Sequence, residues 1–288
     1  MEALHWQNRP SLNGPVMVAA FRGWTDAGGA ASSAATYLAD QWNARPFATV
    51  DAEDFYDFTS LRPQVRLTDD GVREIVWPEN RFLATAVPGG SRDVVFLIGI
   101  EPHLRWGAFC ECVTTVAKAV GARELVTLGS MLTDVVHTRT PPVRGWTSDP
   151  RLSDRFGLSR PQYEGPTGIL GVMQHAFAEV DIPVASLMTQ VPHYVPNTPS
   201  PKATLALVER VCTLLDTHIA TAPLELASAA YEREVSEVVA ADDDIAGYVR
   251  QLEERSDGDD AVSLADLPSR EALAAELERF LREQDRPT

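Results

Sequence analysis

Residues 1–222 alternate short apolar runs with longer segments whose apolar positions recur at helical spacing. The clearest run is Asp93–Gly99, which is almost continuously apolar, as is typical of a strand covered on both faces. Strands that alternate with helices of crossover length predict an α/β fold with a mainly parallel sheet and helices on both of its faces. The expected strands are 16–21, 47–50, 93–99, 124–128 and 182–188, and the expected helices are 30–42, 106–120, 167–180 and 202–219.

A short excursion interrupts this alternation between the second and third expected strands. Val65–Leu67 and Arg73–Trp77 have the residue types of strands, and Asp69-Asp70-Gly71 between them has the composition of a tight turn. We therefore expect a β-hairpin within residues 65–82.

The C-terminal part of the chain differs in charge and pattern. Residues 225–288 contain 18 acidic and 7 basic residues, a net charge of −11, which leaves −5 of the total of −16 for residues 1–224. Apolar residues recur there at spacings of three and four, which predicts amphipathic helices. The expected apolar stripes are Leu224, Ala227, Tyr231, Val235 and Val238, then Ile245, Tyr248, Val249 and Leu252, and finally Leu273, Leu277, Phe280 and Leu281.

These patterns divide the chain into three parts. Residues 1–222 form an α/β body, and residues 223–256 form a helical extension that packs on the body or on a neighbouring subunit. Residues 257–288 form an acidic linker and a terminal amphipathic helix. Asp242-Asp243-Asp244 is placed to cap the second helix of the extension, because negative charge favours a helix N-terminus.

Composition limits the classes of function. The sequence has 288 residues, of which 44% are hydrophobic, enough to form a buried core. Its net charge is −16, and only Lys118 and Lys202 among its basic residues are lysines. A chain this acidic lacks the positive surface that nucleic acids and anionic membranes require.

The expected compartment follows from what the sequence lacks. No apolar run approaches the ~20 residues that span a bilayer, and residues 1–15 do not have the pattern of a secretory signal. Cys110, Cys112 and Cys212 form an odd and sparse set, which fits a reducing compartment better than a disulfide framework. We therefore expect a cytoplasmic protein that binds neither nucleic acid nor membrane.

Polar and aromatic side chains follow several of the expected strands. Parallel α/β sheets place ligand sites beyond the carboxyl ends of their strands, so these side chains are expected to share one edge of the sheet. They define a candidate binding cleft formed by Trp24, Asp26, Asp51, Glu101, His103, His137, Arg139, His193 and Tyr194. The alternative for Asp26 is a structural role as a helix cap, and for each histidine it is a hydrogen-bonded structural role.

The same segments do not have the spacing of several known catalytic sites. The turn Gly23–Gly29 has neither the Gly-Lys-Ser/Thr ending of a phosphate-binding loop nor the glycine spacing of a dinucleotide fingerprint. No His-x3-His, Cys-x2-Cys or Gly-x-Ser-x-Gly spacing occurs. An acid–base set of Asp26, Glu101 and His193 is the arrangement that remains. We assign no catalytic residue, no metal ligand and no cofactor.

Several segments, taken in order along the chain, resemble one known family. They are Phe21–Gly28, Asp54–Phe58 with Arg62-Pro63, Gly99–Pro102 with Trp106, Leu128-Gly129, Asp134, His137–Arg139, Tyr163–Gly168 and Val191–Tyr194. As an ordered set they are similar to the bacterial, actinobacterial-type branch of the proteasome assembly chaperone 2 family, over about Val16–Glu254.

The resemblance implies a three-layer α/β/α fold similar to phosphorylase- and hydrolase-like domains. It also implies homo-oligomers, for which fold analogy suggests a trimer, and proteasome subunits or other proteins as partners. Related assembly factors often end in a hydrophobic-Tyr-x tail that docks between ring subunits. This sequence ends Gln284–Thr288 without that tail, so the docking contact cannot be made in the same way.

Two functions follow from these expectations. The first is a non-catalytic, oligomeric binding or assembly protein. The alternative is a small-molecule-binding protein or an enzyme that uses a phosphorylase-like cleft at the carboxyl ends of the strands. They differ in whether the loops around Asp26, Glu101 and His193 enclose a pocket or form a filled, packed edge.

Overall fold

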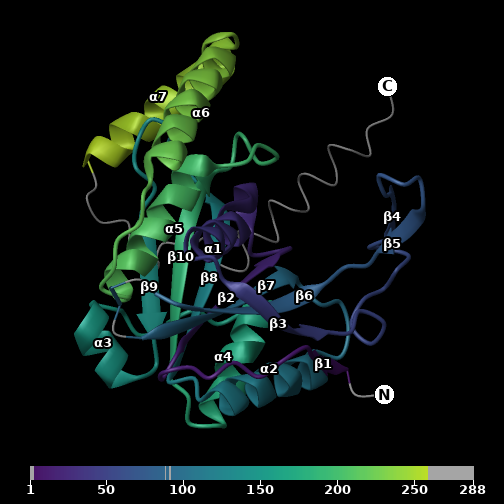
Figure 1. Ribbon diagram of the computed structural model, residues 1–288. Helices are drawn as coiled ribbons and strands as arrows, with labels where there is room; N and C mark the ends of the chain where they lie inside the picture. Colours follow the sequence, from purple (N-terminus) through teal and green to yellow (C-terminus); the bar gives the residue numbers. More distant parts are fainter. Residues whose placement is uncertain (1–2, 88, 91, 259–288) are drawn as a thin grey trace.

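An eight-stranded sheet forms the centre of the molecule (Figure 1). The computed structural model describes residues 3–87, 89–90 and 92–258. The strand order is β1-β3-β6-β7-β2-β8-β10-β9. The bounds are β1 (Leu4–Trp6), β2 (Val16–Arg22), β3 (Arg45–Val50), β6 (Asn80–Ala86), β7 (Asp93–Ile100), β8 (Glu124–Thr133), β9 (Val143–Thr147) and β10 (Val184–Pro192).

The central strands of this sheet are parallel. β7, β2, β8 and β10 pair in parallel with one another, and β3 runs in the same direction because β6 is antiparallel to both β3 and β7. Five of the eight strands of this sheet therefore run the same way, and the prediction of a mainly parallel sheet is confirmed. The antiparallel strands β1, β6 and β9 are additions that the apolar pattern did not predict.

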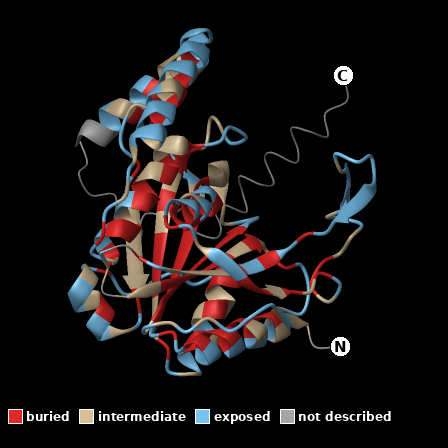
Figure 2. Cartoon of the chain, viewed as in Figure 1, coloured by how far each residue is buried: buried red, intermediate tan, exposed pale blue. Residues whose placement is uncertain are grey.

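Helices cover both faces of the sheet, which confirms the three-layer fold. The helices α1 (Ala30–Gln41) and α5 (Pro201–Leu214) pack on one face, and α2 (Trp106–Val120) and α4 (Ile169–Ala178) pack on the other. The strand β2 shows why its run is continuously apolar. Met17, Ala19 and Phe21 join the core under α2 and α4, whereas Val16, Val18 and Ala20 join the core under α1 and α5. Figure 2 shows buried residues, in red, along the strands of the sheet and on the helices that pack on it.

The expected hairpin is present and stands apart from the body. β4 (Gln64–Leu67) and β5 (Arg73–Val76) form a separate two-stranded antiparallel sheet, and every residue in both strands is exposed. We call residues 64–77 the β4–β5 arm. Figure 1 shows the arm projecting from the body on the side away from α6.

Two helices, α6 (Ala222–Ala240) and α7 (Asp243–Gly258), follow the body. α6 packs along α5, and α7 packs against α6. As predicted, Asp242 caps α7: its Oδ1 accepts hydrogen bonds from the backbone N–H groups of Asp244 at 3.0 Å and Ile245 at 3.1 Å. The remaining short helices of the described chain are η1 (Ala27–Gly29) and α3 (Pro150–Phe156).

The apolar stripe predicted for α6 was wrong at two positions. Ala227 and Val238 are exposed, whereas the buried line consists of Ser228, Tyr231, Val235 and Val239. At 100° per residue, Ser228 and Val239 lie closer than Ala227 and Val238 to the centre of this line, so the line turns those two toward solvent.

The predicted stripe of α7 holds, because Val249 and Leu252 are buried and Ile245 and Tyr248 are half-buried. The division of the chain at residues 222 and 256 stays a prediction. The acidic linker and terminal helix predicted for 257–288 lie outside the described residues, except for 257–258, which belong to the end of α7 and not to a linker.

A close backbone approach between β6 and β7 yields a stability prediction. A Cβ atom added at Gly99 would lie 2.5 Å from the backbone carbonyl oxygen of Glu79 and would collide with the buried Asn80 side chain. We expect Gly99→Ala to lower the free energy of unfolding by about 1–3 kcal/mol, because the backbone cannot yield without distorting the sheet.

The matched control is Gly107→Ala. Nothing lies within 4 Å of an added Cβ atom there, and the position is in helix α2. That substitution is expected to raise the free energy of unfolding by up to about 1 kcal/mol, because alanine favours a helix over glycine. Urea denaturation followed by circular dichroism measures both changes. Equal stability of the two variants would contradict the prediction.

Candidate functional site at the strand ends

The nine predicted cleft residues lie in loops that follow the strands β2, β3, β7, β8 and β10, which run in the same direction. By their place along this edge of the sheet, they fall into three groups. We call Trp24, Asp26 and Glu101 the Glu101 cluster, Asp51 and His103 the outer pair, and His137, Arg139, His193 and Tyr194 the His137 cluster.

Glu101 joins three loops that are far apart in the sequence. Its Oε2 accepts a hydrogen bond from the backbone N–H of Trp24 at 3.0 Å, and its Oε1 accepts one from the backbone N–H of Ile169 at 2.9 Å. Ile169 is the first residue of α4, whose N-cap Gly168 has no side chain to offer. The carboxylate of Glu101 therefore caps α4 from another loop, where a negative charge also interacts favourably with the helix dipole.

Two glycines make room for this carboxylate. A Cβ atom at Gly168 would lie 2.7 Å from Oε1 of Glu101, and one at Gly23 would lie 2.7 Å from its Cβ. Gly23 also has φ of +149°, a backbone conformation that L side chains rarely adopt. The sequence segments around Gly23, Glu101 and Gly168 are thus parts of one contact.

Asp26 is also engaged with a helix start. Its Oδ1 accepts from the backbone N–H groups of Ala31 at 2.9 Å and Ser32 at 3.0 Å, and its Oδ2 accepts from the hydroxyl of Ser32 at 2.6 Å. Burial raises the pKa of Asp26, although the hydrogen bonds from Ser32 and Ala31 and the charge of Arg22 oppose the shift. Asp26 therefore caps the start of α1, the structural alternative considered from the sequence.

Asp51 and His103, the outer pair, form hydrogen bonds with residues that belong to neither of the other two groups. Asp51 contacts the Nε2 of His5 at 3.3 Å and accepts from the backbone N–H of Glu53 at 2.9 Å. The Nδ1 of His103 accepts from the backbone N–H of Asp57 at 3.3 Å, and its ring lies edge-on to Tyr56. These contacts fold the loop after β3 back on the loop after β7.

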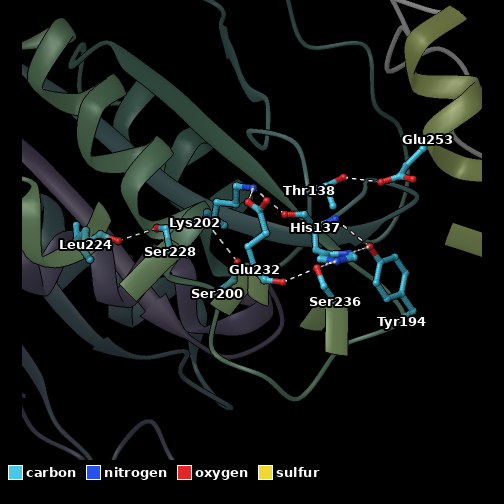
Figure 3. Close-up of polar contacts among 11 residues, drawn as sticks. His137, Thr138, Tyr194, Ser200, Lys202, Leu224, Ser228, Glu232, Ser236 and Glu253 are labelled. Carbon is cyan, nitrogen blue, oxygen red and sulfur yellow. Dashed lines mark hydrogen bonds and ion pairs between the residues drawn. The ribbon is translucent and has the colours of Figure 1, made fainter. Parts of the chain in front are cut away.

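The His137 cluster lies at the seam between the body and α6 (Figure 3). The Nδ1 of His137 is 2.8 Å from the hydroxyl of Tyr194, which also accepts the backbone N–H of His137 at 2.8 Å. The Nε2 of His137 is 3.0 Å from the hydroxyl of Ser236 on α6. In the same loop, the backbone N–H of Arg139 donates to the carbonyl of Val136 at 3.4 Å.

The bonding partners define the proton positions on His137. The hydroxyl of Tyr194 already accepts a backbone N–H, so it donates its own proton to Nδ1. The Nε2–H then donates to Ser236, whose hydroxyl donates in turn to the carbonyl of Glu232 at 2.7 Å. Burial lowers the pKa of His137, which is 3% exposed, and keeps the neutral ring that this chain of bonds requires. Burial also raises the pKa of Tyr194 to about 12.

Further contacts fasten the extension to this edge of the sheet. The Nζ of Lys202 donates to the carbonyl of His137 at 2.7 Å and forms an ion pair with Glu232 on α6. The hydroxyl of Thr138 donates to Glu253 on α7 at 2.7 Å. His193 contacts Asp134 at 3.3 Å, and its ring lies edge-on to Tyr248 of α7.

The reasoning from sequence missed Ser236, Glu232 and Glu253 as members of this seam. They lie on helices whose exposed faces are also charged, so nothing in the pattern distinguishes them. Lys202 was visible as one of two lysines, and it marks the seam because it lies at the start of α5 beside α6.

The chemistry open to these groups is limited by their bonds. The carboxylates of Asp26 and Glu101 already accept backbone N–H groups, and both ring nitrogens of His137 are engaged. Burial raises the pKa of the Cys110 thiol to about 12 and that of Cys212 to about 11, so neither is a thiolate near neutral pH.

Two structural findings concern only the described part of the chain. No three of its His, Cys, Asp and Glu side chains are grouped so that they could hold a metal ion. None of its helices combines the length and the apolar character needed to cross a membrane.

A model of the PAC2 family matches residues 20–239 of the chain. A PAC2 family protein of Streptomyces avermitilis is 45% identical, with a TM-score of 0.76, and the match covers 82% of this chain and 99% of that one. A Mycobacterium tuberculosis protein named as a proteasome-assembly chaperone homologue is 43% identical, with a TM-score of 0.74 and coverage of 81% and 99%.

A more distant structure has the same fold. The archaeal proteasome activator PbaB of Pyrococcus furiosus is 18% identical, with a TM-score of 0.68, and the match covers 83% of this chain and 99% of that one. A search of curated proteins finds no significant match.

The role of Glu101 yields a prediction about stability. Glu101→Ala removes the acceptor of two backbone N–H groups and the negative charge at the start of α4, so we expect a loss of about 1–3 kcal/mol in the free energy of unfolding. Glu101→Gln keeps one carbonyl acceptor and is expected to lose less. Denaturant unfolding measures both, with Glu111→Ala, an exposed glutamate of α2, as the control. A loss no larger than that of the control would contradict the capping role.

The buried neutral His137 yields a prediction about pH. Its pKa in the folded chain lies below the ordinary value of 6.5, so the unfolded chain binds a proton that the folded chain does not. The free energy of unfolding is therefore expected to fall as the pH drops below about 6.5. Glu232 and Glu253 oppose the lowered pKa, and Lys202 adds to it.

The substitution His137→Gln tests this assignment. The variant is expected to lose less stability than the parent chain between about pH 7.5 and about pH 5.5. His175→Gln, which changes an exposed histidine of α4, is the control for removing an imidazole. Urea titrations at both pH values measure the difference. The same pH dependence in His137→Gln and in the parent chain would refute the assignment.

Proposed function

Because the chain belongs to the PAC2 family, we propose that it is a cytoplasmic, non-catalytic, homo-oligomeric protein that binds proteasome subunits during their assembly. The relative from Mycobacterium tuberculosis, named as a proteasome-assembly chaperone homologue, supports this proposal through 43% identity over 81% of the chain. The proposed client is a protein surface rather than a small molecule.

The proposal rests on one observation: the polar groups at the strand ends that could take part in acid–base chemistry are bonded to the protein itself. Glu101 and Asp26 hold the starts of α4 and α1, and His137 holds α6. An acid–base catalyst must reach the proton of its substrate, whereas the His137 ring bonds to Tyr194 and Ser236 and is buried. These three polar groups therefore shape the edge of the sheet instead of facing a substrate.

The same loops also expose several large apolar or aromatic side chains. Trp24 follows β2 and is 64% exposed, and Tyr163 precedes α4 and is 62% exposed. Leu104 follows β7, and Leu132 lies near the end of β8. Large apolar side chains on firmly held loops are typical of surfaces that bind proteins, where tryptophan and tyrosine contribute most of the affinity.

The net charge adds a requirement on the client. The chain carries −16, so a client with a basic surface around an apolar patch associates faster and is selected over an acidic one. Binding should then weaken as the salt concentration rises, because ions screen the attraction between exposed charges.

Binding to isolated proteasome subunits of the same organism tests the proposal. Surface plasmon resonance should detect binding of the parent chain to at least one subunit type. Trp24→Ala should weaken it by at least about tenfold, because an exposed tryptophan at the centre of an interface is a typical hot spot. Trp24→Phe keeps an apolar ring and should weaken it by less than about threefold.

Two results would contradict the proposal. One is the lack of binding between the parent chain and every subunit type. The other is a large rise in melting temperature with nucleosides, phosphate or amino acids that disappears in His193→Ala. That second result would support the alternative of a small-molecule site at the strand ends.

A further inference from the structure

The β4–β5 arm concentrates the exposed apolar surface of the described chain. Twelve large hydrophobic side chains are exposed in the described residues, and six of them lie in the short stretch from Val65 to Trp77. They are Val65, Leu67, Val72, Ile75, Val76 and Trp77, with exposed fractions between 43% and 66%. Scattered exposed hydrophobic residues need no explanation, but such a concentration marks an interaction surface.

The register of the hairpin places three of these side chains, Val65, Leu67 and Ile75, on one face. Val65 pairs with Ile75, and Leu67 pairs with Arg73, so all four share a face. The opposite face has Gln64 beside Val76, and Arg66 beside Glu74, with the last two joined by an ion pair of 3.1 Å. The arm is therefore amphipathic, with one apolar face that contains a single charge, Arg73.

The described chain does not bury this apolar face. All eight strand residues are exposed, and the ring contact between Trp77 and Phe58 holds the arm at its base. A two-stranded hairpin is only marginally stable in water without a further layer. A partner that covers the apolar face would supply that layer.

The outer face of α6 has the matching character. At 100° per residue, an arc of about 120° on this helix contains Leu226, Ala227, Ala230, Glu234, Glu237 and Val238. All of them are exposed except the half-buried Ala230, with Leu226 at 74% and Val238 at 62%. The outer face of α6 is therefore apolar with two carboxylates. The apolar face of the arm, by comparison, has one guanidinium.

Charge favours this pairing between two copies of an acidic chain. Residues 222–258 contain ten acidic and three basic residues, a net charge of −7. Most surfaces of two such chains repel each other, whereas the apolar face of the arm brings only Arg73 to the contact. A guanidinium that approaches Glu234 and Glu237 is attracted to the contact and fixes its orientation.

The two faces cannot meet within one molecule, because Figure 1 shows the arm and α6 on opposite sides of the body. We propose that the apolar face of the β4–β5 arm binds the outer face of α6 in a second copy of this chain. The contact joins two different surfaces, so it generates a closed ring when the rotation between copies closes. This inference rests on the homo-oligomeric part of the proposed function and names the surfaces that would form the oligomer.

Light scattering coupled to size exclusion tests the contact with single substitutions. The parent chain is expected to have the mass of an oligomer, which is two or more times the 31.5 kDa of one chain. Leu67→Asp on the apolar face of the arm and Val238→Asp on α6 should each reduce it to the monomer mass. Gln64→Asp adds the same charge to the other face of the same strand and should leave the oligomer intact. Unchanged circular dichroism verifies that each variant is folded.

A mixing experiment identifies the partner surface. Leu67→Asp retains an intact α6 face, and Val238→Asp retains an intact arm, so an equal mixture should form a dimer through the one intact contact. A monomeric parent chain, an oligomer that survives Leu67→Asp, or a mixture that stays monomeric would each overturn the proposal. Binding of proteasome subunits is measured separately with the monomeric variants, so a failure of client binding and a failure of self-association are distinguishable.

Discussion

The arrangement of the strand ends depends on one carboxylate, that of Glu101, which accepts backbone N–H groups from two loops. The start of α4 needs an acceptor because the first N–H groups of a helix have no partner within it. Gly168 cannot supply one, and Glu101 does so from 68 residues away. The same carboxylate positions the loop of Trp24, so the most exposed aromatic ring at this edge stands on a fixed backbone.

A second set of contacts connects this edge to the helical extension. His137 reaches α6 through Ser236, and Lys202 reaches it through Glu232. Tyr194, from the loop after β10, bonds to His137 and packs on the apolar cluster formed by α6 and α7. The extension is therefore attached to the loops after β8 and β10. A protein bound to the strand-end loops and a protein bound to α6 would each act on the same seam.

The sequence indicates the centre of the fold much better than its margins. β2 and β7 were predicted because both of their faces are buried, which makes the runs continuously apolar. β9 was missed because it is an edge strand of half-buried residues that include Arg144 and Gly145. At the strand ends the sequence predicts a shared edge but not its grouping. Glu101 and Ile169, or His137 and Ser236 at a separation of 99 residues, meet only because the helices return to that edge.

The distribution of polar and apolar groups favours assembly over catalysis. A catalytic site exposes polar groups to its substrate and holds them with an apolar or hydrogen-bonded support. At this edge the order is reversed. The carboxylates of Glu101 and Asp26 accept backbone N–H groups, and the buried His137 ring bonds to two hydroxyl groups. The side chains of Trp24 and Tyr163, in contrast, are mostly exposed. The arm also leaves apolar residues exposed: the Arg66–Glu74 pair lies on one face, and Val65, Leu67 and Ile75 lie uncovered on the other. Covering such surfaces with a second protein is favourable because it removes apolar area from water. The net charge of −16 makes the chain repel other acidic proteins.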